Sequence, residues 1–256
     1  MEQKIIISRG GMNTPCIVRE PDFGEPVRVV LGVHGFGGCM CDDIQESIAE
    51  EMEIFRSVSL RFDFPAHGEN EEQALTLSGC VDTLLNVAEY AKERYPHLED
   101  LCIFATGFGA YVTLIALQDL LEMPGKVKLV VQTPSVRMHE TLLSMLRMSR
   151  ETLWAMHKAV IRAPRPFEVT YRFFEELQEH IALTTYPIPM LILHGESDAY
   201  IHQEDIQNFR RINERSKLVY IPGASHRFVE EGAWDMVLDL TRDWFEFEQV
   251  LLSESF

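Results

Sequence analysis

Short apolar runs alternate with segments of helical periodicity along most of the chain. Several runs, such as Val29–Val33 and Met190–Leu193, are apolar without interruption. Uninterrupted apolar strands are typical of a parallel sheet that is buried on both faces. We therefore predict eight strands, at Lys4–Ser8, Cys16–Arg19, Arg28–His34, Ser57–Phe62, Leu101–Ala105, Val127–Gln132, Met190–His194 and Lys217–Ile221.

Apolar positions that repeat with the period of a helix fall between these runs. They mark one face of each of three helices: Val81, Leu84, Leu85, Ala88 and Ala91; Val112, Ile115, Ala116 and Leu120; and Trp234, Val237, Leu238, Thr241 and Phe245. Strands that alternate with helices favour the α/β class, with a doubly wound, mostly parallel eight-stranded sheet. In such a sheet, ligands bind outside the carboxyl ends of the strands.

The interval from Pro134 to Pro189 interrupts this alternation. It contains a Met- and Leu-rich helical pattern around 142–148, the proline-containing segment Arg162–Pro166 and a second helical pattern around Phe173–His180. The interval is too long for a simple connection. We therefore predict a helical cap at approximately 134–189, inserted into a single domain that spans residues 1–256. The methionines suit an adaptable binding surface, but packing beneath the cap explains them equally well.

Composition narrows the range of partners. The chain has 256 residues, 46% of them hydrophobic, and 23 basic against 40 acidic residues give a net charge of −17. Such a charge disfavours nucleic acid and anionic membranes as partners. The first residues lack a signal-peptide pattern, and the five scattered cysteines do not suggest a disulfide framework. We therefore expect a cytoplasmic protein with reduced thiols.

Gly107 stands in the most informative segment of the chain. The apolar run Leu101–Ala105 leads through Thr106 and a tight turn into a helix, which is the context of the G-x-S-x-G nucleophile elbow. The segment Ala105–Gly109 fills the five positions of that motif, with glycine where the nucleophilic serine is expected. Glycine accepts the strained backbone of the elbow, so the exchange relaxes the turn by about 1 kcal/mol and removes the attacking hydroxyl.

Three further motifs complete the pattern of a hydrolase site. His34-Gly35-Phe36-Gly37-Gly38 follows the third strand, and Arg61–Glu69 follows the fourth. The last two strands lead into His194-Gly195-Glu196-Ser197-Asp198 and Pro222-Gly223-Ala224-Ser225-His226. With these motifs the chain resembles the α/β-hydrolase superfamily over nearly its whole length. The cap segment Phe167–Leu177 is loosely similar to the cinnamoyl and feruloyl esterase branch of that family.

The resemblance assigns a role to each candidate site residue. The chain order of nucleophile position 107, then Asp198, then His226 agrees with this fold. His226 is expected to act as general base, and Asp198 to orient it. The backbone N–H groups of Phe36 and Phe108 are expected to form the oxyanion hole. We place the substrate-binding surface at His34, Gly35 and Thr106.

Other candidate groups receive supporting roles. His67 and His194 are expected to brace the site through hydrogen bonds, and Cys39 and Cys41 flank the oxyanion loop, where a free buried thiol is the simpler interpretation. A shifted register would make Thr106 the nucleophile, but it would place bulky phenylalanines where the elbow requires small residues. Neither H-E-x-x-H nor C-x-x-C occurs, so we expect no metal and no cofactor.

The missing serine leaves several functions open. We expect a carboxylesterase-like protein that is inactive or very weak as a serine hydrolase. One alternative is a ligand- or partner-binding pseudoenzyme, for which neuroligins, similar proteins with glycine at this position, are a precedent. Another is an enzyme that uses the His226–Asp198 dyad without a serine, as proposed for cofactor-free oxygenases of this fold. A third is an active cinnamoyl- or feruloyl-esterase-like hydrolase whose serine was replaced artificially.

The ligand is expected to be a small hydrophobic acyl or aryl compound, because the predicted cap is apolar and two phenylalanines, Phe36 and Phe108, flank the predicted site. The sequence does not define the oligomeric state.

Overall fold

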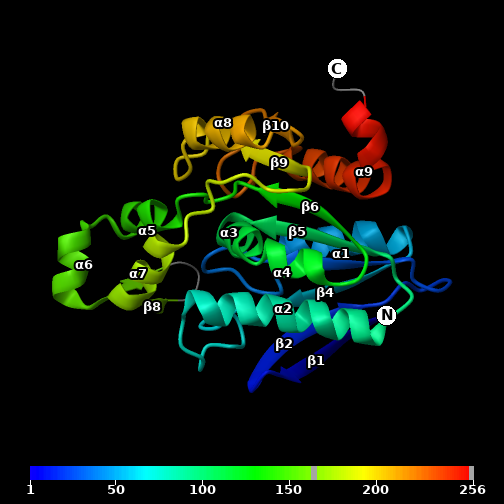
Figure 1. The fold of residues 1–256 in the computed structure, drawn as a ribbon, viewed down its shortest axis with the longest axis horizontal. Helices are drawn as coiled ribbons and strands as arrows, with labels where there is room; N and C mark the ends of the chain where they lie inside the picture. The colour runs from blue at the N-terminus through cyan, green and yellow to red at the C-terminus, as the bar shows by residue number, and fades with distance from the viewer. Residues whose placement is uncertain (163–165, 254–256) are drawn as a thin grey trace.

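A mixed eight-stranded sheet forms the centre of the molecule (Figure 1). The computed structural model describes residues 1–162 and 166–253. Its strands are β1 (Glu2–Arg9), β2 (Met12–Arg19), β3 (Arg28–Val33), β4 (Ser57–Phe62), β5 (Asp100–Thr106), β6 (Lys126–Gln132), β9 (Met190–Gly195) and β10 (Lys217–Ile221). They lie in the order β1-β2-β4-β3-β5-β6-β9-β10. The eight predicted strands are confirmed, most of them within two residues at each end.

The register brings the ends of the parallel strands to one edge of the sheet. β2 runs antiparallel to both β1 and β4, and every other neighbouring pair is parallel. At this edge Val33 of β3 lies opposite Ala105 of β5, and Gly195 of β9 lies opposite Ile221 of β10. The loops that follow these strands carry the predicted site motifs, so the topology gathers them at the carboxyl edge.

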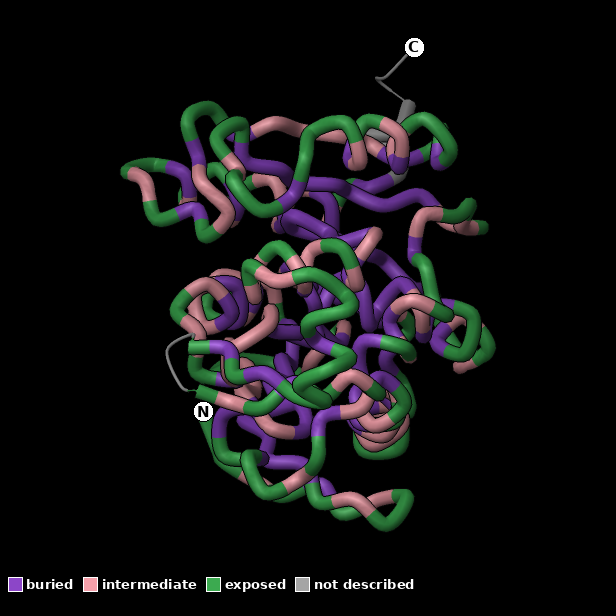
Figure 2. Tube along the Cα trace, turned by 90° about the vertical axis from the view of Figure 1, so that its left-hand side faces the viewer, coloured by how far each residue is buried: buried purple, intermediate pink, exposed green. Residues whose placement is uncertain are grey.

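Helices cover both faces of the sheet. Those of the main body are α1 (Asp43–Ile54), α2 (Leu77–Arg94), α3 (Gly107–Ile115), α4 (Leu117–Glu122), α8 (Gln203–Ile212) and α9 (Ala233–Ser253). One face buries the larger apolar cluster, with α2 and α3, and the other buries a second cluster, with α1 and α9. In Figure 2 the buried residues run through the interior between exposed outer segments. The three predicted helices are confirmed, the second being divided at Ala116 into α3 and α4.

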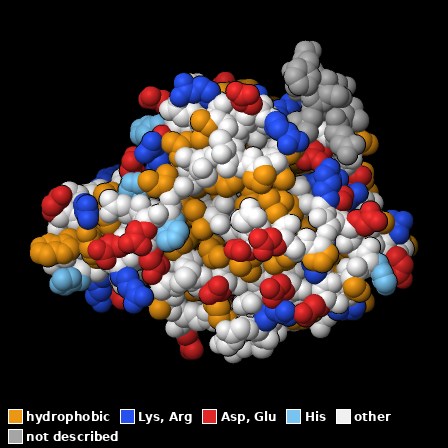
Figure 3. Space-filling view, viewed as in Figure 1, with side chains coloured by type: hydrophobic (Ala, Val, Ile, Leu, Met, Phe, Trp, Pro, Cys, Tyr) orange, Lys and Arg blue, Asp and Glu red, His pale blue; other side chains and the backbone are white. Residues whose placement is uncertain are grey.

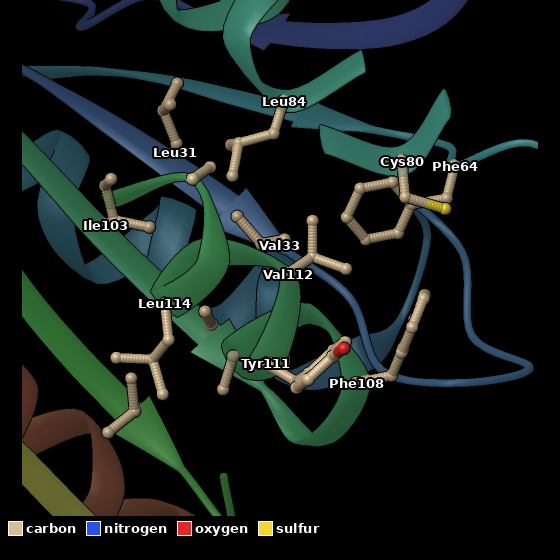
Figure 4. Packing of buried hydrophobic residues seen from close by; sticks show 14 of the residues in the cluster. Leu31, Val33, Phe64, Cys80, Leu84, Ile103, Phe108, Tyr111, Val112 and Leu114 are labelled. Atoms are coloured by element: carbon tan, nitrogen blue, oxygen red, sulfur yellow. The ribbon is translucent and has the colours of Figure 1, made fainter. Parts of the chain in front are cut away.

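The interface between α2 and α3 shows why the apolar period predicts helices well here. Leu84 of α2 and Val112 of α3 are both completely buried, and both face Leu31 and Val33 of β3 (Figure 4). Each apolar stripe therefore packs against the sheet and against its neighbour, which is the arrangement that an amphipathic period implies.

The interval between β6 and β9, called the cap below, projects from the carboxyl edge (Figure 1). It contains α5 (Met138–Leu146), α6 (Arg150–Met156), β7 (Lys158–Ile161), β8 (Phe167–Thr170) and α7 (Tyr171–Glu179). Helices occur at both predicted places, whereas α6 and the antiparallel ribbon of β7 and β8 were not predicted. Residues 163–165 of the predicted proline-containing segment lie outside the described residues.

Three of the four cap methionines serve packing, whereas Met156 is 55% exposed. Met138 is 1% exposed, and Met145 and Met148 are partly buried against the main apolar cluster. Of the two explanations that the sequence allowed, the structure favours filling of the core. Among the described residues, no helix combines the length and the apolar character needed to cross a lipid bilayer.

Replacement of Gly109 by alanine is expected to destabilise the fold strongly. A Cβ at this position would lie 2.3 Å from the carbonyl oxygen of His34 and 2.7 Å from that of Val33, so α3 would have to move off β3. We expect a loss of about 2–3 kcal/mol in the free energy of unfolding, measured by urea denaturation. Gly35→Ala is the control, because its Cβ would approach Thr106 only to 3.4 Å. Equal losses for the two variants would contradict this account.

Candidate active site

Gly107 occupies the turn between β5 and α3, and its backbone φ is +50°. Glycine adopts this left-handed conformation at little cost. Thr106, the last residue of β5, has an ordinary φ of −115°, so the turn falls in the register that makes residue 107 the nucleophile position. A Cβ built on Gly107 would lie 3.7 Å from Nε2 of His226, which is the sole described atom within 4 Å apart from its chain neighbours. A side chain at residue 107 would therefore face His226.

His226 and Asp198 form a hydrogen-bonded pair. Asp198 lies in the loop after β9 and His226 in the loop after β10, and 2.8 Å separates Nδ1 of His226 from Oδ2 of Asp198. The carboxylate can only accept, so Nδ1 carries the proton and Nε2 presents its lone pair. The other carboxylate oxygen accepts the N–H groups of Tyr200 and Ile201 at 2.8 and 3.0 Å.

This environment keeps Asp198 ionised. Its side chain is only 1% exposed, and burial alone raises the pKa of the carboxyl. The hydrogen bond from His226 and the two backbone N–H groups outweigh burial and lower the pKa below its usual 3.8. An ionised, fixed carboxylate is what a general-base histidine needs to hold one tautomer and to stabilise its protonated form.

Two backbone N–H groups are placed to donate hydrogen bonds to a negatively charged oxygen. Phe108 lies in the first turn of α3, where N–H groups have no partner within the helix. Among residues 1–162 and 166–253, no hydrogen bond engages the N–H of Phe108 or that of Phe36 in the loop after β3. Both groups are thus available as donors, and the N-terminus of α3 adds a favourable dipole for an anion.

The predicted substrate-binding residues divide into two kinds. Gly35 and Thr106 are half-buried neighbours next to Gly107, and their assignment to substrate binding stays a prediction. His34 is completely buried, and both its ring nitrogens are engaged. Nδ1 donates to the carbonyl of Gly35 at 2.8 Å, and Nε2 accepts the N–H of Phe64 at 3.1 Å. The assignment of His34 to substrate binding is therefore wrong, because its side chain instead fixes the loop after β3.

The two predicted bracing histidines also differ. Nδ1 of His67 donates to the carbonyl of Pro65 at 2.8 Å, so this residue does brace its turn. His194 is buried, and neither of its ring nitrogens has a hydrogen-bond partner in the described structure. Its Nδ1 lies 3.9 Å from Oδ2 of Asp198, and its ring packs edge-on against Tyr220. The prediction is wrong for His194, which acts through packing.

Aromatic rings from the cap close over the oxyanion loop. The ring of Phe36 lies 5.0 Å from that of Phe108, 4.9 Å from Phe167 of β8 and 6.1 Å from Phe173 of α7, between ring centres. Phe108 is only 1% exposed. The ring of Phe108 therefore belongs to the packing between cap and sheet, and its backbone N–H is the part of the residue that faces the site.

Asp63, within the Arg61–Glu69 motif, has a structural role that the sequence did not reveal. Its carboxylate accepts the N–H of Met40 at 2.6 Å and that of Glu69 at 2.8 Å, so it ties the loop after β3 to the loop after β4. The Arg-Phe-Asp pattern was the available signal. Nearby, Cys39 is half-buried and Cys41 exposed, so the interpretation as buried thiols is wrong for Cys41.

Within the described ranges, no group of three or more His, Cys, Asp or Glu side chains is arranged to hold a metal ion. The groups that the arrangement itself offers for chemistry are a base, Nε2 of His226, and two donors, the N–H groups of Phe36 and Phe108.

Comparisons with known proteins place this architecture. No family model and no curated protein matches the sequence. Est1E from Butyrivibrio proteoclasticus, solved with ferulic acid bound, superimposes with a TM-score of 0.82 at 19% identity, over 96% of this chain and 99% of that one. The chain has the α/β-hydrolase fold.

Two other proteins of this fold are similar over nearly their whole length. The esterase domain of a Rhodothermus marinus protein gives a TM-score of 0.72 at 18% identity, over 95% of this chain and 97% of that one. Alpha/beta hydrolase domain-containing protein 10 from mouse gives 0.75 at 14% identity, over 95% and 98%. Similarity at these identities establishes the α/β-hydrolase fold and leaves the reaction to be argued from the site.

The stability of the protein is expected to fall between about pH 6.5 and pH 4 because of His34. Burial lowers the pKa of His34 to about 4 from 6.5. The unfolded chain therefore binds this proton first, and the stabilisation present above pH 6.5 is lost as the pH falls to 4. Glutamine does not titrate. In His34→Gln the free energy of unfolding, measured by urea denaturation, should therefore fall by about 3 kcal/mol less between pH 6.5 and pH 4 than in the wild type.

The exposed His97 supplies the matched control. His97→Gln makes the same exchange at a surface position, and its pH profile is the reference against which that of His34→Gln is compared. Parallel profiles for the wild type and His34→Gln would show that His34 is not the titrating group.

Proposed function

We propose that the chain is a carboxylesterase-like protein with little or no serine-hydrolase activity, because residue 107 supplies no hydroxyl. The observation that carries this proposal is the 3.7 Å between a Cβ at Gly107 and Nε2 of His226. A serine oxygen extending from that Cβ would come within reach of the histidine that the Asp198 carboxylate orients. Glycine supplies no nucleophile, while the Asp198–His226 pair and the N–H groups of Phe36 and Phe108 are present.

The retained groups support binding of an acyl or carboxylate group. The N–H groups of Phe36 and Phe108 and the N-terminus of α3 favour a carbonyl or carboxylate oxygen. Est1E, which shares the fold, was solved with ferulic acid. A small aryl or acyl acid, or its ester, is therefore the ligand class that we assign to this edge of the sheet. A pseudoenzyme that binds such a ligand without turnover is included in this proposal.

Gly107→Ser is expected to create esterase activity. In a serine hydrolase the nucleophile contributes about 10⁶ in turnover, so we expect a gain of at least about 10³-fold on short-chain and cinnamoyl aryl esters, measured by release of the aryl alcohol. The new Cβ makes only an ordinary contact, 3.7 Å from Nε2 of His226, and the positive φ of residue 107 should lower the free energy of unfolding by about 1 kcal/mol.

Two controls separate chemistry from backbone strain. Gly107→Ala carries the same positive φ without a hydroxyl and should stay inactive, and Gly107→Ser combined with His226→Ala should lose the gain. A wild-type chain as active as Gly107→Ser would refute the proposal of an inactive serine hydrolase.

A second candidate function rests on the free Nε2 of His226. We infer that glycine at residue 107 leaves room for one water molecule beside His226, because a Cβ there would already lie 3.7 Å from Nε2. Nε2 would take a proton from that water while its oxygen adds to an ester carbonyl, the N–H groups of Phe36 and Phe108 would hold the oxyanion, and the departing alkoxide would regain the proton from His226. The reaction is then a hydrolysis without a covalent intermediate.

This dyad mechanism predicts a distinct pattern in the unmodified chain. Any slow hydrolysis of activated aryl esters should fall by about 10²-fold in His226→Ala and should also fall in Asp198→Asn. A fluorophosphonate, which labels active serines, should neither inhibit nor label the wild type, whereas it should label Gly107→Ser. Activity that survives in His226→Ala would exclude the dyad.

A further inference from the structure

The ring of His226 is held by one side-chain hydrogen bond in the described structure. Its Nδ1 donates to Oδ2 of Asp198 at 2.8 Å, and its side chain remains 28% exposed. A hydrogen bond at one ring nitrogen fixes that atom but lets the ring swing about it, so the bond alone does not aim Nε2 at residue 107. In a serine hydrolase the hydroxyl engages Nε2. Because Gly107 has no side chain, another contact is needed to orient the ring.

Tyr200 makes a second contact with His226. The centres of the two rings lie 5.2 Å apart, and the ring planes meet at 69°. This is the edge-to-face arrangement that aromatic pairs prefer. Among the described residues, Tyr200 is the one aromatic side chain whose ring contacts His226. Its ring therefore opposes the swing that the hydrogen bond to Asp198 leaves free.

The backbone of Tyr200 holds the other member of the pair. Its N–H donates to Oδ1 of Asp198 at 2.8 Å, and the N–H of Ile201 donates to the same oxygen at 3.0 Å. The side chain of Ile201 is only 4% exposed, which anchors this short segment in the core. Tyr200 thus contacts both partners, the carboxylate through its N–H and the imidazole through its ring.

The fold has little use for the ring of Tyr200. The residue is 48% exposed, and its hydroxyl has no hydrogen-bond partner in the described part of the chain. It also lines a cavity of about 60 Å³, together with Val136, Thr141 and Ser144 of the cap, so part of its side chain is not packed against protein. An exposed ring of this kind adds little to the core. The contact with His226 is therefore the interaction that best explains a tyrosine at this position.

Long-range electrostatics does not replace this contact. Acidic side chains are scattered over the face that Figure 3 shows, the cap included, and the net charge of the chain is −17. The attraction of many dispersed carboxylates has no single direction and is screened by salt. It cannot choose one orientation of the His226 ring, whereas a ring packed against one side of it can.

We propose that Tyr200 is a positioning residue for the Asp198–His226 pair, and that its ring holds the imidazole in the orientation that directs Nε2 towards residue 107. The ring carries this role and the hydroxyl does not, so phenylalanine would serve as well. The effect on the orientation of His226 does not require that the chain hydrolyse esters. Only the effect on turnover rests on the proposed function.

Proton NMR of the unmodified chain tests the orientation directly. A histidine Nδ1 proton that is hydrogen-bonded to a carboxylate resonates downfield of the amide protons, and its absence in His226→Ala assigns it. We expect Tyr200→Leu to speed the exchange of this proton with water by about 5-fold, because the ring swings more freely, and Tyr200→Phe to restore most of the protection. Phe23→Leu removes a ring that is 86% exposed and outside the site, and should leave the exchange rate unchanged.

Kinetics in the Gly107→Ser background supply a second readout. Tyr200→Leu should lower kcat by about 10-fold with KM within about 2-fold, because orientation of the base matters to the reaction more than to binding, and Tyr200→Phe should restore most of kcat. If Gly107→Ser gains no esterase activity, the proposed function fails, and the exchange rates still decide the role of Tyr200.

Several results would overturn the proposal. The wild type would lack the downfield resonance, Tyr200→Leu would exchange as slowly as the wild type, or Tyr200→Phe would exchange as fast as Tyr200→Leu. Urea denaturation of each variant separates loss of the contact from loss of the fold. A Tyr200→Leu chain that does not fold would also contradict the proposal, because it would make the ring part of the core.

Discussion

The position of α3 against the end of β3 is the constraint on which the candidate site depends. Gly109 brings the backbone of α3 so close to the carbonyl groups of Val33 and His34 that a single methyl group would collide with both. This contact fixes where the first turn of α3 starts, and therefore where the N–H of Phe108 and the backbone of Gly107 lie. The ring of His34 then holds the loop after β3 through two hydrogen bonds. The two oxyanion donors thus come from elements that share one packed interface.

The site therefore consists of two parts: a scaffold that the packing of the fold requires, and the Asp198–His226 pair, which the packing does not require. The scaffold is made of backbone contacts and buried side chains, and none of it needs a hydroxyl at residue 107. Conversely, the Asp198–His226 pair is not required by the packing, because His226 remains 28% exposed and makes its described side-chain hydrogen bond to Asp198 alone. A buried carboxylate that holds one exposed histidine is an arrangement suited to proton transfer or to ligand binding, since it contributes little to the core.

The sequence predicted the sheet, its helices and the residues that meet at its edge, because apolar periodicity and motif order are local signals. It failed where an outcome depends on tertiary packing. His34 and Phe108 belong to motifs, but only the fold shows that their side chains are buried in the core. The ribbon of β7 and β8 has four residues per strand, too few to show a period, and it is stabilised by pairing across the cap. The carboxylates that line a cavity beside the loop after β3, among them Asp42, Glu71 and Glu168, form no sequence motif, because they come together only in three dimensions.

The loop after β3 separates two environments of opposite polarity. At residue 107 the free groups of the backbone are N–H donors, reinforced by the N-terminus of α3, and they fit an oxygen with negative charge. The cavity bordered by Gly37 and Gly38 of the same loop is lined instead by the carboxylates of Asp42, Glu71, Glu72 and Glu168. Since both environments use residues of one loop, which Asp63 anchors through Met40, a molecule in either would contact the same rigid segment. At residue 107, therefore, polarity rather than apolar area favours one kind of ligand, an oxygen that carries negative charge.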